Sequence, residues 1–223
     1  MDNLEKHFVR NDPIIYTIDN IVTDEECEHI INLAKTNLRH AKVCANNGNS
    51  VVSLGRTNKS YWIRHDFDEI TMNVCERISS IVNIPLQFAE NMQIIYYDKN
   101  QKYNQHYDGW KHDKTEHSFN AMNNYGQRLV TALCYLNTVE KGGSTCFTKL
   151  NIHVPAEKGK LLTFHNVYTN TNKLHPDTKH SGMPVLEGEK YAFNLWFREV
   201  PRGQTLKEYD EDKYLEILPN TPE

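Results

Sequence analysis

The sequence predicts a mainly β protein, a β-sandwich or jelly roll with helices flanking one sheet, and two observations support this class. Between residues 86 and 200, short segments rich in β-branched and aromatic residues alternate with Gly, Asn and Pro. Before residue 85, apolar residues instead recur at helical spacing. Several short strands at this rhythm favour a sandwich or jelly roll, because these folds close off most sheet edges.

Two helices are predicted near the N-terminus, over residues 23–38 and 66–83. In both stretches apolar residues gather on one helical face. Each stretch begins with a potential capping box, Thr23 with Glu26 and Asp66 with Glu69. We therefore expect residues 1–85 to form a mostly helical support that packs on the outside of one sheet.

The β-rich part contains five strand-like segments: NMQIIYYD, RLVTALCYLN, STCFTKL, GKLLTFHN and KYAFNLWFRE. No internal repeat and no linker rich in Pro, Gly or Ser interrupts the chain. The 223 residues are therefore expected to form a single domain, 1–223, with a β core at 86–200 and an acidic C-terminal extension at 201–223.

Composition excludes several classes of function. A formal net charge of −4 argues against a dedicated nucleic-acid surface. No run approaches eighteen apolar residues, and no signal peptide is visible, so we expect no membrane span. Five scattered cysteines without a C-x-x-C pair predict free thiols in a reducing compartment. The location and the oligomeric state stay open, with a cytoplasmic location favoured.

The segment NQHYDGW suggests a metal site. Side chains at positions i and i+2 project from the same face of a strand, so His106 and Asp108 should point together while Tyr107 faces away. An imidazole beside a carboxylate supplies two of the three ligands in the facial triad of non-haem Fe(II). The pair alone is a weak signal, because H-x-D is frequent by chance.

A third ligand must come from another strand, and several downstream histidines are candidates. We expect His153 to face solvent, since it alternates with apolar residues, and His165 ends an apolar strand as a possible core residue. His112 and His117 belong to the polar segment 110–126, which we expect to form a loop over the site. The remaining candidates are His175, in a turn-like run before a proline, and His180.

The residues after His180 favour it over His175. Lys190 follows ten positions later, on a strand with no other reason to carry a charge. A buried cation needs an anion, and a small dianionic ligand would supply a carboxylate. The alternative is a lysine that extends its amine to solvent beside Glu189.

The segments MQIIYYDKNQKYNQHYD, QRLVTALCYLNTVEKGGSTCF and HSGMPVLEGEKYAFNLWFRE, with the earlier GRTNKSYWI, resemble in order the catalytic domain of the prolyl 4-hydroxylases. These are 2-oxoglutarate- and Fe(II)-dependent dioxygenases, and the resemblance covers roughly residues 50–200. It implies a double-stranded β-helix core, of the jelly-roll or cupin-like type, with N-terminal support helices. It also implies coordination of Fe(II) by His106, Asp108 and His180, with Lys190 holding the C5 carboxylate of 2-oxoglutarate.

The resemblance implies further site residues, and each of them could instead have only a structural role. Two would line the 2-oxoglutarate pocket, where the alternative is a core strand residue: Tyr97 and Thr145. Four would shape or support a peptide groove, and for the arginine a surface position is the alternative: Tyr103, Arg128, Trp196 and Glu90. Two departures from the family pattern are Asn100, where glycine is frequent, and segment 110–126, which leaves substrate choice open.

The function implied is hydroxylation of prolyl residues in a peptide or protein, giving hydroxyproline, succinate and CO2. Fe(II), 2-oxoglutarate and O2 would be required, with ascorbate as a further expected cofactor. The peptide, possibly collagen-like, would lie extended across aromatic side chains under loops from 52–62 and 110–126. Alternatives are a dioxygenase acting on another side chain or a small molecule, and a catalytically silent module that binds proline-rich peptides.

Overall fold

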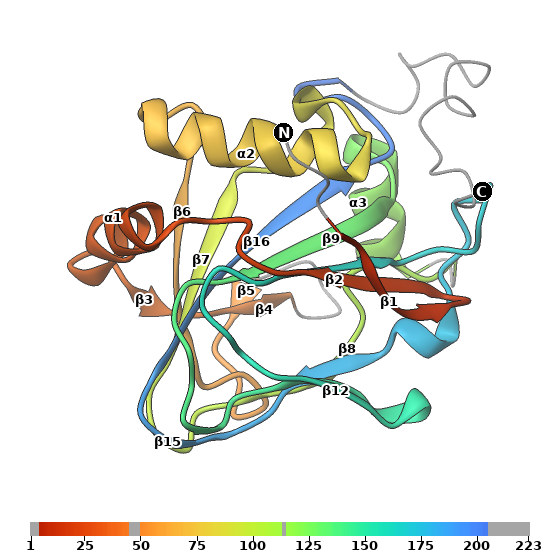
Figure 1. Cartoon of the computed structure of the whole chain (residues 1–223). Coiled ribbons are helices and arrows are strands. Elements are labelled where there is room, and N and C mark those ends of the chain that lie inside the picture. Colours follow the sequence, from red (N-terminus) through yellow and green to blue (C-terminus); the bar gives the residue numbers. More distant parts are fainter. Residues whose placement is uncertain (1–4, 45–49, 113–114, 205–223) are drawn as a thin grey trace.

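The structure is a computed structural model that describes residues 5–44, 50–112 and 115–204. A large antiparallel sheet runs through the molecule, with a smaller sheet facing it on one side and helices covering the other (Figure 1). The strands of the large sheet are, in spatial order, β1 (His7–Asn11), β2 (Ile14–Ile18), β13 (Leu161–His165), β9 (Arg128–Tyr135), β16 (Lys190–Arg198), β7 (Met92–Tyr97), β6 (Lys59–Ile63) and β3 (Arg39–His40).

The smaller sheet has four strands: β12 (Ile152–Val154), β11 (Thr145–Phe147), β14 (His180–Gly182) and β8 (Tyr103–His106). The described residues also form two short two-stranded pairs: β10 (Lys141–Gly142) with β15 (Val185–Glu187), and β4 (Val43–Cys44) with β5 (Ser50–Val51). Two antiparallel sheets facing each other form a jelly roll. The predicted class, mainly β with flanking helices, is confirmed.

The described part of the chain also contains α1 (Asp24–Lys35), α2 (Glu69–Val82), α3 (Glu116–Tyr125) and the 3-10 turns η1 (Leu86–Phe88), η2 (Thr148–Leu150) and η3 (Pro176–Thr178). The capping box predicted at Thr23 and Glu26 is present at the start of α1. The box predicted at Asp66 is wrong. Asp68 caps α2 instead, accepting a hydrogen bond from the backbone N–H of Thr71, because Asp66 is held in a two-bond ion pair by Arg64.

The large sheet separates two cores, since its central strands are buried on both faces. Its outer face packs against α1 and α2 through residues such as Ile30, Ile78, Phe193 and Phe197. Its inner face packs against the smaller sheet through Ile15, Tyr135, Phe147 and Phe164. Burial on both faces explains why β9 reads as a nearly continuous apolar run rather than as an alternating one.

The interpretation of residues 1–85 as mostly helical is wrong, because this region also supplies four strands of the large sheet, β1, β2, β6 and β3. The run IIYTI of β2 is entirely buried between β1 and β13, and so lacks the alternation by which a strand is recognised. The single-domain interpretation stays a prediction.

Two segments expected to be loops contain regular structure. Within 52–62, strand β6 begins at Lys59, and within 110–126, α3 occupies Glu116–Tyr125 with Thr115 as its N-cap. The acidic extension lies outside the described residues from position 205 onward. Within the described ranges, no helix is long and apolar enough to cross a membrane.

The expected free thiols are present where the structure describes them. Cys27, Cys75, Cys134 and Cys146 are all buried and unpaired. Burial raises the pKa of Cys75 to about 12, so this thiol packs as a small apolar group. Asn100 adopts φ +65°, a left-handed conformation that asparagine tolerates and glycine adopts freely, which accounts for the departure from the family pattern at that turn.

Candidate active site

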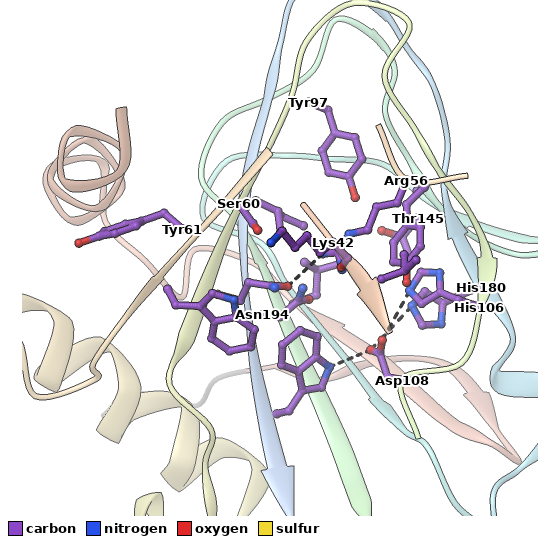
Figure 2. A pocket seen from close by; sticks show the side chains of 18 of the residues that line it. Lys42, Arg56, Ser60, Tyr61, Tyr97, His106, Asp108, Thr145, His180 and Asn194 are labelled. Atoms are coloured by element: carbon purple, nitrogen blue, oxygen red, sulfur yellow. Dashed lines mark hydrogen bonds and ion pairs between the residues drawn. The ribbon is translucent and has the colours of Figure 1, made fainter. Parts of the chain in front are cut away.

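Strands β8 and β14 bring three potential metal ligands together. These strands are antiparallel neighbours in which His106 pairs directly with His180, while Asp108 follows two residues after β8. The potential ligand atoms of all three residues lie within 4.8 Å of one another. His106 Nε2 is 3.5 Å from Asp108 Oδ1, and His180 Nε2 is 3.8 Å from Asp108 Oδ2 (Figure 2).

Both imidazoles are oriented by the backbone. His106 Nδ1 lies 2.8 Å from the carbonyl oxygen of Asn104, and His180 Nδ1 lies 2.9 Å from that of Thr178. Each Nδ1 therefore carries the proton and donates it to a carbonyl, which leaves the Nε2 lone pairs directed toward Asp108. This is the arrangement by which proteins fix the tautomer of a metal-binding histidine.

Asp108 is held by a second set of contacts. Its Oδ2 accepts a hydrogen bond from Thr131 Oγ1 at 2.8 Å and another from the indole Nε1 of Trp196 at 2.9 Å. Asn166 Nδ2 donates in turn to Thr131 Oγ1 at 2.9 Å. These buried donors fix the carboxylate plane and turn Oδ1 toward His106.

The electrostatics of the triad favour a metal ion. Burial lowers the pKa of His180 to about 4, and the neighbouring His106 adds to this shift. Burial alone would raise the pKa of Asp108, but the imidazoles of His180 and His106 and the guanidinium of Arg128 hold it well below its usual range. At neutral pH the site therefore presents imidazole nitrogen and carboxylate oxygen, a donor set that fits Fe(II).

His175, the rejected alternative, is not part of this cluster. It is buried beneath the ring of Tyr168, where its Nδ1 accepts from the N–H of Asp177 and its Nε2 lies 3.4 Å from Asp12 Oδ1. His165 is also buried, at the end of β13, and burial lowers its pKa to about 4, as expected of a core histidine.

Lys190 is buried in the floor of the same cavity and does not extend to solvent. Its side chain is 2% exposed, and its amine donates to the carbonyl oxygen of Gly143 at 2.7 Å. The rings of Tyr97 and Tyr135 lie 5.4 Å and 5.1 Å from the amine. Burial lowers the pKa of Lys190 to about 7. Such a group favours a bound anion, because an anion would offset the cost of burying the charge.

Tyr97 and Thr145 both line the cavity beside this lysine. The hydroxyl of Thr145 accepts a hydrogen bond from Tyr135 Oη at 2.7 Å. The surroundings of Lys190 thus combine one cation with several hydroxyl groups in a setting closed to bulk water, which suits the distal carboxylate of a small dicarboxylate.

Arg128 and Trp196 form one wall of the cavity. The guanidinium of Arg128 lies 3.8 Å from the indole centroid and makes a two-bond ion pair with Glu90, at 2.6 and 2.8 Å. Arg198 also pairs with Glu90, at 2.8 Å. Trp196 is 5% exposed, so it both borders the cavity and donates to the metal ligand Asp108, a contact that the sequence did not predict.

Tyr103 lines the same cavity next to His106. Its ring stacks on His106 at a centroid distance of 3.6 Å, and the guanidinium of Arg56 lies 4.6 Å above it. All of the sequence-predicted pocket and groove residues except Glu90 line one cavity of about 870 Å³. Glu90 acts through Arg128.

The sequence reasoning missed several residues around this cavity: Arg56, Trp110, Thr131, Asn166 and Asn194. Arg56 lies in the segment GRTNKSYWI, which was recognised as similar to the family. Nothing in that segment assigned a role to the arginine side chain. Asn194 lines the cavity from β16, and Thr131 on β9 pairs with the cavity residue Trp196, but alternation alone identifies neither, because both strands are buried on both faces.

Fold and site together define a non-haem Fe(II)- and 2-oxoglutarate-dependent oxygenase. The sequence profile of the 2OG-Fe(II) oxygenase superfamily matches residues 92–198, the segment that carries the triad and Lys190. The chain belongs to this superfamily and, within it, to the prolyl 4-hydroxylase family. The resemblance stated from the motifs is thereby confirmed.

Two relatives illustrate the similarity. A "Putative prolyl 4-hydroxylase" of Acanthamoeba polyphaga mimivirus is 32% identical over 82% of this chain and 74% of its own length. "Prolyl 4-hydroxylase 2" of Arabidopsis thaliana is 32% identical over 84% of this chain and 68% of its own length.

Among solved structures, the viral collagen prolyl hydroxylase of Paramecium Bursaria Chlorella virus-1, in complex with 2OG, superposes with a TM-score of 0.64. It is 26% identical, and the match covers 82% of this chain and 94% of that one. A Pseudomonas putida prolyl-4-hydroxylase, 16% identical with a TM-score of 0.55 over 85% of this chain and 93% of its own, shares the fold. The predicted double-stranded β-helix is confirmed by these likenesses.

Proposed function

We propose that this chain hydroxylates prolyl residues of a peptide or protein, consuming 2-oxoglutarate and O2 and giving hydroxyproline, succinate and CO2. The observation that carries the proposal is the convergence of the triad and buried Lys190 on one cavity. The relatives named prolyl 4-hydroxylases support a prolyl target.

The chain's own residues have distinct parts in this reaction. His106, Asp108 and His180 would hold Fe(II), which, when bound, supplies the activation of O2 coupled to oxidative decarboxylation of 2-oxoglutarate. Lys190 binds the distal carboxylate of the co-substrate and thereby directs its other end toward the triad. The apolar inner core beneath the site excludes bulk water, so these charged contacts act at low dielectric.

The substrate groove is formed by Tyr103, Arg128 and Trp196, with Glu90 fixing the position of Arg128. Aromatic side chains next to a metal site suit a prolyl ring in an extended, polyproline-like peptide. Collagen-like repeats are one candidate substrate, and ascorbate is an expected further cofactor.

The proposal is tested by two measurements. Anaerobic addition of Fe(II) and 2-oxoglutarate should produce a visible charge-transfer band, and a panel of proline-containing peptides should gain one oxygen atom each, located on proline by mass spectrometry. Oxygen on a different residue would favour the alternative side-chain dioxygenase. Peptide binding without any band or succinate formation would favour the silent binding module.

A further inference from the structure

The cavity extends well beyond what the metal and a small dicarboxylate need. From the triad it continues past β16, β7 and β6 to the edge strand β3 and the residues that follow it, Lys42 and Val43. At about 870 Å³ it lies near the upper end of the range for small-molecule sites. The additional space is a groove, which we call the β3 groove, lined by Arg39, Lys42, Arg56 and Trp62.

The wall of the β3 groove is cationic, although the chain as a whole has a net charge of −4. Among the described lining residues the only carboxylate is Asp108, which belongs to the metal site. The described carboxylates that pair with arginines pair with Arg64, Arg77, Arg128 and Arg198, and none of them pairs with Arg39 or Arg56. The positive charges of Arg39 and Lys42 are therefore not neutralised by a described carboxylate, and a cleft concentrates such a field.

Arg56 holds the backbone of Lys42 next to the cavity. Its guanidinium donates to three neutral acceptors: Asn58 Oδ1 at 3.1 Å, the carbonyl oxygen of Lys42 at 3.0 Å, and Gln93 Oε1 at 3.3 Å. None of these three partners is a carboxylate, and the contact with Lys42 ties that backbone to the inner face of the sheet. Figure 2 shows Lys42 and Arg56 on the cavity side, facing the space in front of the triad.

Sheet register directs Arg39 to the same face. Arg39 pairs with Ser60 on β6, Ser60 pairs with Ile95 on β7, and directly paired residues share a face of the sheet. Ser60 and Ile95 both line the cavity, so Arg39 projects from the cavity face at the sheet edge. Between this edge and the triad lies Trp62, 44% exposed and 5.8 Å from the ring of Trp196.

The spacing of the strands sets a distance. Three strand intervals separate β16 from β3, which corresponds to about 14 Å at about 4.8 Å each. An extended peptide advances about 3.3 Å per residue, so about four residues would span this distance. A peptide whose proline lies in front of the triad at β16 would thus place a side chain three to five positions away next to Arg39 and Lys42.

We propose that the β3 groove selects peptides that carry acidic side chains three to five positions from the target proline. The inference rests on the proposed prolyl hydroxylation and names its substrate class. Trp62 provides the apolar floor between the proline and the acidic residues, and Arg39 and Lys42 recognise the carboxylates.

The test measures binding separately from turnover. Fluorescently labelled peptides with one central proline and Glu, Gln or Lys at positions three to five on either side are titrated with the full chain, and anisotropy gives the dissociation constants. An exposed ion pair contributes about threefold in affinity, so two pairs should favour the Glu peptide over the Gln peptide by about tenfold at low salt. This preference should shrink as salt screens the charges.

Matched variants locate the effect. R39Q/K42Q should abolish the preference, and R39E/K42E should reverse it toward the Lys peptide. The control is Lys59→Gln, because Lys59 lies on the neighbouring strand β6 but faces Tyr96 on the other side of the sheet. It should leave the preference unchanged.

Equal affinity for the Glu, Gln and Lys peptides would overturn the proposal. So would a preference for the Glu peptide that survives in R39Q/K42Q. Binding of a single-stranded oligonucleotide more tightly than the Glu peptide would overturn it as well. Prolyl oxidation of all the peptides at equal rates, without charge preference, would leave the proposed function standing. Charge-selective binding without hydroxylation of proline would instead reject the proposed function and keep the acidic-peptide groove.

Discussion

Replacing Lys190 by methionine removes a charge that the fold buries, so we expect Lys190→Met to stabilise the metal-free protein. The folded-state pKa is about 7, against about 10.4 for a lysine in an unfolded chain. A difference of about three pKa units corresponds to about 4 kcal/mol of unfolding free energy lost in the wild type near pH 7. The lost hydrogen bond to Gly143 costs the variant about 1 kcal/mol, which leaves a net gain of about 3 kcal/mol.

The pH dependence has a definite sign. Below pH 7 Lys190 is charged in both the folded and the unfolded states, so the wild type carries the full penalty of burying the charge. Between about pH 7 and pH 10 the unfolded chain binds a proton that the folded protein does not, so wild-type stability rises with pH relative to the variant. Urea unfolding of the metal-free proteins should show an advantage of about 3 kcal/mol for Lys190→Met at pH 7, falling close to zero near pH 10.

The Lys190→Met substitution should also weaken the binding of 2-oxoglutarate. A charge-assisted hydrogen bond contributes about 1.5–3 kcal/mol, so the affinity for 2-oxoglutarate should fall about 10- to 100-fold, measured by anaerobic titration of the Fe(II) form. A variant that is no more stable than wild type at pH 7 and binds 2-oxoglutarate equally well would refute the reasoning, since Lys190 would then be neither a buried cation nor an anion-binding group.

Three further predictions concern the ligands and their support. His180→Ala should abolish turnover and weaken Fe(II) binding, whereas His175→Ala should retain the metal, as measured by equilibrium dialysis under anaerobic conditions. Thr131→Val should weaken Fe(II) binding about tenfold, because Asp108 Oδ2 loses one of its two donors; the dissociation constant measures this directly. Glu90→Gln should lower the unfolding free energy by about 3–5 kcal/mol, because two buried arginines lose their charged partner; urea unfolding provides the value.

Each of these predictions has a contrary result. Metal loss in His175→Ala with retention in His180→Ala would show that the wrong histidine was chosen. An unchanged Fe(II) affinity in Thr131→Val would mean that the indole of Trp196 alone holds the carboxylate. For Glu90→Gln, wild-type stability would indicate that the arginines reach other acceptors once the carboxylate is neutralised.

Local sequence was sufficient for the strongest elements. The central strands β7, β9, β13 and β16 fall inside the segments predicted from their β-branched and aromatic content. The two N-terminal helices follow from apolar periodicity, because each must bury one face against the large sheet. Strands β1, β2 and β6 were missed; β1 is exposed along its whole length and β2 is buried along its whole length, so neither shows the alternation that marks a strand.

The site residues divide in the same way. The spacing of His106 and Asp108 and the unusual place of Lys190 were visible in the sequence, because each is a local anomaly of charge or pattern. The support of Asp108 by Thr131 and Trp196 was not visible, since it joins three separate strands or strand ends.

By itself, the amino-acid sequence determined the fold class, the family resemblance, and the choice of His106, Asp108, His180 and Lys190. Periodicity and residue chemistry are properties of neighbours along the chain, and so they can be read without coordinates. Only the tertiary structure decided which atoms converge: the tautomers of the two imidazoles, the burial of the Lys190 amine, and the cationic groove at β3. These depend on strand register and on contacts between residues distant in the sequence, which no local pattern encodes.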